Sequence, residues 1–303
     1  MIGYMCAYLR FYYPAEFIVS YLNNADNDDD IIMGQELAKV KNIKIKPIEF
    51  QKSSGEYFYS KEEKAIYKGI GSIKFLNNSV GEELHDLSQK VYCNFVDVLS
   101  DLKEQTSLKK NQLEILIKLN FFKKFGEANQ LISVVKLYDQ FGSSKIISKQ
   151  KLDNLGIHYS LVRPFAASET EKQFRGIYNT KLISNLLSLS NTCPMTIKEH
   201  IDYEKEYAGD ISYTNKSLAH HFYVLNVDTL YSPKIKIYSL YSGETHLIKI
   251  NSRIFKKQKI KEGDVINLSK CKKRPKYFKT EKGWEIKPGE FDVWVETYKK
   301  VIL

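Results

Sequence analysis

The feature that most constrains the fold is a change of periodicity near His220. From there on, apolar and polar residues alternate with a period of two, as expected for strands with one buried face. The alternating runs are HFYVLNVDT, KIKIYSLY, HLIKI, DVINLSK and VWVETY. Ser242-Gly243 and Glu262-Gly263-Asp264 supply turns between them. The alternating region after His220 predicts a small β-barrel or sandwich of five strands.

The preceding part of the chain reads mostly as helix. A helix over 3–22 is interrupted near Pro14, and a second helix runs over 30–41. Short β-prone pieces lie at 43–47, 57–59 and 65–67. The chain is therefore predicted to be an α+β multidomain protein.

Two further helices are expected after residue 100. Ser107 is a candidate N-cap for a helix over 108–119, and Asn120 suits the left-handed conformation that ends it. The next helix has an apolar face at helical spacing, formed by Ala128, Leu131, Ile132, Val135 and Tyr138. We interpret 143–205 as a helical connector that packs on its neighbours.

Charge is distributed unevenly along the chain. The net charge is +10 over the whole sequence, with −3 in residues 1–100, +6 in 101–200 and +7 in 201–303. A polyanionic partner would therefore meet the later two thirds. The alternative is a lysine-rich composition that scatters charge over every surface.

Several site classes find no support in the sequence. The four cysteines have no zinc-ligand spacing, which indicates reduced structural thiols of a cytoplasmic protein. The acidic run over 26–30 lacks the Gly and Glu of a calcium loop, and Gly69-Ile70-Gly71 lacks the rest of a nucleotide loop. No run approaches the ~20 apolar residues of a membrane helix, so no membrane partner is expected.

Three segments, in this order and spacing, carry a resemblance to a known family. They are YLRFYYPAEF at Tyr8–Phe17, KGIGSIKFLNNSVGEE at Lys68–Glu83 and LEILIKLNFFKKFGEANQL at Leu113–Leu131. Together they resemble the C-terminal part of the alpha subunit of bacterial or phage DNA polymerase III, the C-family replicative polymerase.

The resemblance implies a division into four segments. These are the end of the polymerase fingers (1–50), tandem helix–hairpin–helix elements (51–142), the connector (143–205) and an oligonucleotide-binding (OB-like) barrel (206–303). The family's catalytic carboxylates and Mg²⁺ belong to a palm domain that this sequence does not contain. We therefore expect a truncated or split nucleotidyltransferase with no cofactor of its own, and no primer extension by the chain alone.

A helix–hairpin–helix element offers backbone N–H groups to a DNA phosphate. The family's first turn has Gly-hydrophobic-Gly where this chain has Phe75-Leu76-Asn77, so we expect Phe75 to crowd the backbone approach there. Asn120 replaces the Gly of the second turn and tolerates the left-handed conformation. The candidate DNA-binding residues of the two hairpins are Lys74, Asn77, Asn120, Lys123, Lys124 and Gly126.

An OB-like barrel grips single strands with stacking aromatics and with cations that follow the backbone. Its most concentrated basic run is KCKKRPKYFK at 270–279. The candidates are Tyr238, Lys256, Lys257, Lys272, Lys273, Arg274, Lys276 and Tyr277. The alternative is a solvated basic hairpin whose aromatics belong to the core.

The expected partners are primer–template DNA, the rest of a polymerase and a sliding clamp. For the clamp, Gln150–Leu155 is a poor peptide candidate because it lacks an aromatic end. The alternative function is a stand-alone DNA-binding or processivity module that never joins a palm.

Overall fold

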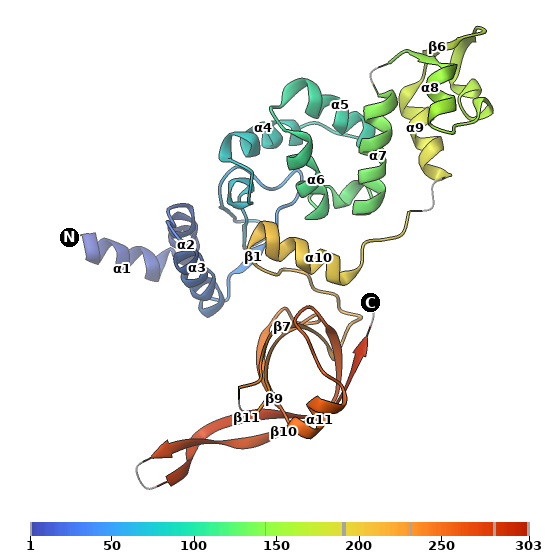
Figure 1. Cartoon of the computed structure of the whole chain (residues 1–303). Helices are drawn as coiled ribbons and strands as arrows, with labels where there is room; N and C mark the ends of the chain where they lie inside the picture. Colours follow the sequence, from blue (N-terminus) through green and yellow to red (C-terminus); the bar gives the residue numbers. More distant parts are fainter. Residues whose placement is uncertain (1, 143, 190–191, 231, 281–282, 302–303) are drawn as a thin grey trace. The chain divides into compact units, whose positions relative to one another are not determined.

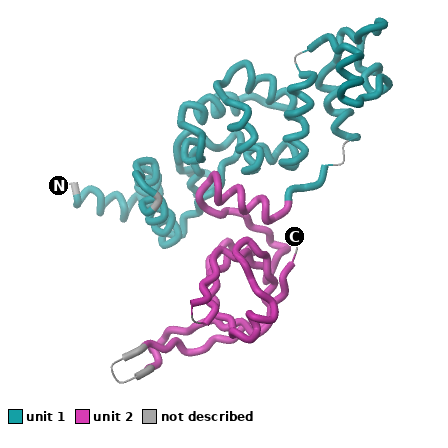
Figure 2. The backbone as a smooth tube through the Cα atoms, in the orientation of Figure 1, with its two compact units in different colours: residues 1–195 teal, residues 196–303 magenta. Residues whose placement is uncertain are grey.

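The computed structural model describes residues 2–142, 144–189, 192–230, 232–280 and 283–301. The chain forms two compact units, residues 1–195 and 196–303 (Figure 2). The prediction of an α+β protein is confirmed, because helices dominate the first unit and strands the second (Figure 1).

The first unit begins with three helices, α1 (Ile2–Tyr12), α2 (Pro14–Asn23) and α3 (Asp28–Val40). Pro14 interrupts the first helix as predicted, and it occupies the first turn of α2, where its missing N–H costs nothing. The third helix starts two residues before the predicted position. The reason is Asn27, whose side-chain oxygen accepts a hydrogen bond from Asp30 N at 2.9 Å and so caps the helix.

A small three-stranded sheet follows, with strands β1 (Lys44–Lys46), β2 (Phe58–Ser60) and β3 (Ala65–Tyr67) in the order β1-β3-β2. All three lie where the sequence predicted them. A 3-10 turn, η1 (Ile70–Ser72), comes next. Gly69 and Gly71 allow close packing of the chain here. A Cβ added at Gly69 would lie 2.5 Å from Glu56 C, and one added at Gly71 would lie 1.7 Å from Asn78 Oδ1.

The helical centre of the unit contains α4 (Asn78–Ser88), α5 (Phe95–Gln105), α6 (Lys110–Lys118), η2 (Lys123–Phe125) and α7 (Ala128–Phe141). The predicted N-cap role of Ser107 is wrong. Its N–H and hydroxyl both donate to the Glu83 carboxylate, while Gln112 Oε1 accepts from Lys109 N and starts α6 at Lys110. The buried face of α7 includes Leu131, Val135 and Tyr138, as predicted.

The predicted helical connector contains a sheet that the sequence analysis did not anticipate. Strands β4 (Ile146–Ser148), β5 (Ala166–Glu169) and β6 (Gln173–Ile177) pair in the order β4-β6-β5. Around them lie α8 (Lys149–Asn154), η3 (Tyr159–Leu161), η4 (Arg163–Phe165) and α9 (Asn179–Ser188). Leu152, inside the poor clamp-peptide candidate, is fully buried in this core.

The second unit starts with α10 (Ile197–Tyr203) and a π-helical turn, η5 (Glu204–Ala208). Five strands follow: β7 (His221–Asp228), β8 (Lys234–Ser239), β9 (Thr245–Ile250), β10 (Val265–Thr280) and β11 (Gly283–Val301). They close into a barrel in the order β7-β8-β9-β11-β10, with β10 paired back to β7. Only the β9–β11 pairing is parallel.

The barrel core consists of the inward residues of the alternating runs. Val224, Ile237, Ile248 and Val295 are almost fully buried in it. A short helix, α11 (Ser252–Lys257), joins β9 to β10 and was not predicted. Beyond the barrel, β10 and β11 continue as a two-stranded ribbon (Figure 1).

Near the small sheet, Glu63 is the centre of a charged cluster. Its carboxylate pairs with Lys46, accepts from the Tyr67 hydroxyl at 2.6 Å and lies 3.2 Å from Lys52 Nζ. The Lys46 ammonium, then the Tyr67 hydroxyl and Lys52, lower the pKa of Glu63 to about 2. This stabilisation is complete above the ordinary pKa of 4.5 and disappears as the pH falls through about 2.

We therefore predict that Glu63→Gln lowers the unfolding midpoint at pH 7, and that the difference from wild type shrinks as the pH falls below about 4.5. Urea unfolding at several pH values measures this. Glu62→Gln is the matched control, since Glu62 is exposed and has no ion pair in the part of the chain that the structure describes. A Glu63→Gln effect that is constant with pH would contradict the prediction.

Candidate nucleic-acid interface

The second predicted hairpin connects α6 to α7. Asn120 has φ +59°, so the left-handed conformation expected there is confirmed. The turn is closed by backbone hydrogen bonds, with Phe121 N donating to Leu116 O and Lys123 N to Asn120 O, both at 3.0 Å. Gly126, with φ +145°, precedes α7 in a conformation that favours glycine.

Aromatic packing supports this hairpin on its buried side. Phe121 and Phe122 are buried, and the Phe50 ring packs on both, with centroids 5.7 and 5.2 Å away. Phe50 N also donates to Phe121 O at 2.9 Å. Lys123 and Lys124 remain exposed on the η2 turn, so the hairpin presents two ammonium groups on a fixed backbone.

The two lysines differ in their surroundings. Lys124 Nζ donates to Gln51 Oε1 at 2.6 Å and lies 5.7 Å from the centre of the Phe125 ring. Lys123 has no ion-pair partner among the described residues.

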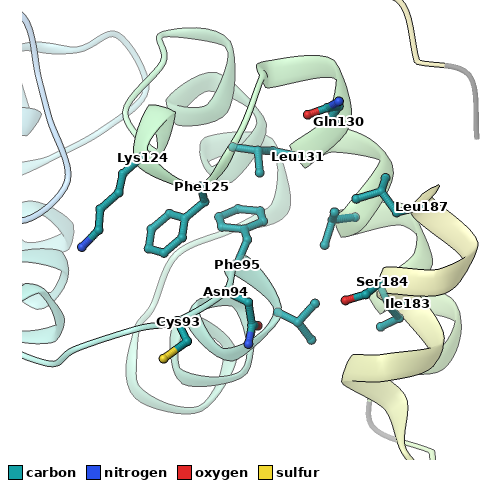
Figure 3. Close-up of a pocket in the computed structure, with 12 residues that line it drawn as sticks. Cys93, Asn94, Phe95, Lys124, Phe125, Gln130, Leu131, Ile183, Ser184 and Leu187 are labelled. Carbon is teal, nitrogen blue, oxygen red and sulfur yellow. The ribbon is translucent and has the colours of Figure 1, made fainter. Parts of the chain in front are cut away.

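A pocket of about 260 Å³ adjoins this turn and is bounded by α5, α7 and α9. Figure 3 shows Phe95 and Phe125 among the residues that line it. The Lys124 side chain extends away from Phe95.

The first hairpin precedes α4. Phe75 has φ +70°, so a bulky side chain occupies the position where the family has glycine. Its ring is 65% exposed, and the Lys74 ammonium lies 5.2 Å from the ring centre. Asn77 accepts from Val80 N at 2.9 Å, so its side-chain oxygen caps α4 rather than facing a ligand.

The two hairpins lie at opposite ends of α6. Gln112, in the first turn of α6, donates to Phe75 O at 2.8 Å and thereby joins the first hairpin to the start of that helix. The second hairpin follows the end of α6. The helix has 9 residues, which corresponds to a length of roughly 14 Å.

The predicted barrel residues divide into three groups. Tyr238 is 4% exposed and donates its hydroxyl to Tyr213 O at 3.1 Å, so its ring is not available for stacking and we do not retain it as a site residue. Lys256 and Lys257 are exposed in the last turn of α11. The remaining candidates, Lys272, Lys273, Arg274, Lys276 and Tyr277, lie on β10.

Acidic residues of β11 offset part of the charge on β10. Glu296 lies 3.0 Å from Lys272 Nζ, and Glu290 lies 2.7 Å from Lys276 Nζ. The bond from Lys276 lowers the pKa of the Glu290 carboxyl, and that from Lys272 lowers the pKa of Glu296. Lys273 has no such partner in the described ranges, and Tyr277 is 55% exposed.

The strand register reveals a row of side chains that the sequence analysis missed. Lys234, Lys249, Trp294 and Lys272 are direct neighbours across β8, β9, β11 and β10. The half-buried Trp294 ring has the Arg274 guanidinium 5.0 Å and the Lys249 ammonium 6.0 Å from its centre. Trp294 was visible in a predicted strand, but its cations come from two pairings: the antiparallel β10–β11 pairing brings Lys272 and Arg274, and the parallel β9–β11 pairing brings Lys249.

The described residues offer neither a metal site nor a membrane span. No group of three or more His, Cys, Asp or Glu side chains there is arranged to hold a metal ion. None of the helices described is both long and apolar enough to cross a membrane.

Comparison with known proteins identifies the relationship. The chain is 30% identical over 129 residues to the DNA polymerase III subunit alpha of Campylobacter jejuni, covering 42% of this chain. It is also 30% identical over 128 residues to that of Treponema pallidum and over 145 residues to that of Ureaplasma parvum.

Part of this chain resembles the DNA polymerase III alpha subunit. The resemblance predicted from the sequence motifs is thus confirmed. The matches cover 11 to 14% of the length of these alpha subunits. No family model matches the chain.

The left-handed Phe75 generates a prediction. Phe75→Gly removes the penalty of roughly 1–2 kcal/mol for a β-carbon in this conformation, partly offset by the entropy of glycine in the unfolded chain. We expect the variant to be slightly more stable than wild type in urea unfolding. Asn120→Gly is the control and should change the stability less, because asparagine tolerates the left-handed conformation. A loss of stability in Phe75→Gly would show that the exposed ring contributes more than the strain costs.

Proposed function

We propose that this chain is a DNA-binding section of a replicative DNA polymerase III alpha subunit. The second hairpin would hold the phosphates of template–primer duplex, and the barrel would hold single-stranded template. The observation that carries the proposal is the similarity to three alpha subunits, at 30% identity over 42 to 46% of the chain.

The geometry of the second hairpin supports the duplex-binding part. A left-handed residue, a following helix N-terminus and exposed lysines are the features that bring backbone N–H groups and cations to one phosphate. Here Asn120 is the left-handed residue, α7 provides the helix N-terminus, and Lys123 and Lys124 are the exposed lysines. The first hairpin is the weaker contact, because Phe75 takes the place of glycine.

The topology of the barrel supports the single-strand part. Strands in the order β7-β8-β9-β11-β10, with a helix between β9 and β10, are those of an oligonucleotide-binding barrel, whose ligands lie across its second and third strands. On β8 and β9 these positions include Lys234, Lys236 and Lys249. Trp294 adjoins them and offers an aromatic surface flanked by cations, which is the arrangement that single strands favour.

For the hairpin, we predict that replacing Lys123 and Lys124 together by Glu weakens duplex binding about equally for all sequences and flattens its salt dependence, because the lost contacts are to phosphates. Titrations of labelled duplexes at several salt concentrations measure both effects. Lys74→Glu is the matched control and should do less. Equal losses at Lys74 and at the pair would mean that both hairpins contribute alike.

For the barrel, we predict that Trp294→Ala weakens single-strand binding by the whole chain by about 1–3 kcal/mol, the value of one stacked base. Duplex binding should change little. Tyr241→Ala, which removes an exposed aromatic from the β8–β9 turn, should leave both affinities unchanged. If Trp294→Ala lowers the unfolding midpoint and not the affinity, Trp294 is a packing residue.

A further inference from the structure

Gln51 joins three segments that are distant in the sequence. Its Oε1 accepts from Lys124 Nζ at 2.6 Å, while its Nε2 donates to Ser88 O at 3.2 Å and to Lys90 O at 3.1 Å. The carbonyls of residues 88 and 90 can only accept and the ammonium can only donate, so this network admits one orientation of the amide. The amide nitrogen is thus fixed at the carbonyl of Ser88, which ends α4, and at that of Lys90 just beyond it, and the amide oxygen is directed at Lys124.

The backbone of Gln51 is strained to make this arrangement. Its φ is +71°, a conformation that non-glycine residues adopt at a cost and that is found preferentially where function requires it. The turn around it is closed by Lys52 N and Ser53 N, which both donate to Glu49 O. The neighbouring Phe50 anchors the turn to the second hairpin through its ring and its bond to Phe121 O.

We propose that Gln51 is a positioning residue for Lys124, which it holds in the place where the hairpin meets a DNA phosphate. The inference rests on the proposed function of the hairpin. A lysine ammonium has three donors, so Lys124 can keep its bond to Gln51 and still donate to a phosphate. A flexible lysine loses side-chain entropy when it is immobilised on a ligand, and Gln51 imposes that loss before DNA arrives.

Lys123 provides an internal comparison. It lies next to Lys124 on the same turn and is also exposed, but in the described part of the chain it has neither an ion-pair partner nor an amide that holds its ammonium. If Gln51 acts through Lys124, its effect on binding must depend on Lys124 and be independent of Lys123.

The test is a double-mutant cycle built on Gln51→Gly. Glycine relieves the strain at φ +71°, so the fold should remain as stable as wild type while the side chain is lost. We expect Gln51→Gly to weaken duplex binding by up to about tenfold, the value of ordering one lysine side chain, and by no more than Lys124→Ala does. The slope of log Kd against log salt concentration should stay close to wild type in Gln51→Gly, because the lysine is still present, and should fall by about one in Lys124→Ala. In a Lys124→Ala background Gln51→Gly should have no further effect, whereas in a Lys123→Ala background its full effect should persist.

A purely structural role of the turn predicts a different pattern. Gln51→Gly would then weaken binding equally in the Lys124→Ala and Lys123→Ala backgrounds, and this result would overturn the proposal. Unchanged duplex affinity of Gln51→Gly would overturn it as well. Gln51→Met, which keeps the length and the strain but not the hydrogen bonds, should behave like Gln51→Gly in binding.

A second measurement separates this inference from the proposed function. Acetylation of the whole chain without DNA, followed by mass spectrometry, reports the reactivity of each lysine. Lys124 should react more slowly than Lys123 in wild type and reach the rate of Lys123 in Gln51→Gly. If the wild-type chain binds no duplex, the proposed function fails, and the reactivity still decides whether Gln51 holds Lys124. Equal reactivity of the two lysines in wild type would overturn the inference by itself.

Discussion

The contact between Phe50 and the second hairpin is the interaction on which the candidate site of the first unit depends. A turn with no helix or strand of its own inserts one ring among Phe121, Phe122, Phe125 and Tyr92 and adds a backbone bond to Phe121 O. Buried aromatic rings provide the largest apolar area per residue, and their edge-to-face contacts restrict orientation as well as distance. The turn that carries Lys123 and Lys124 is therefore supported by a core residue from a segment that precedes it by many residues.

Secondary structure was largely predictable because it depends on local pattern. Pro14 interrupts a helix, Asn120 ends one, and the alternating runs after His220 became the strands of the barrel. The wrong prediction at Ser107 has a tertiary cause. The N-cap position of α6 is Lys109, and Ser107, two residues before it, donates its hydroxyl and its N–H to Glu83 on another helix.

The candidate site was predictable only in part, because charge and exposure depend on pairing. Lys123 and Lys124 could be found from their place after a turn residue. Trp294 and Lys249 could not, since their proximity comes from a parallel pairing between strands that are not adjacent in the sequence. Tyr238 was predicted to offer its ring to a ligand, but it is buried. The alternation of buried and exposed residues along β8 stops there, and Ile237 to Ser239 are all buried.

The position of β11 has a consequence for how the barrel is made during synthesis. It is the last strand in the sequence, yet it lies between β9 and β10 in the sheet order. Until β11 emerges from the ribosome, both of these neighbours keep an unpaired edge, and an unpaired edge is a template for pairing with another chain. The nascent barrel must therefore remain open until the second half of β11 has been translated, and a premature stop before Val293 would leave two exposed edges rather than one shorter strand.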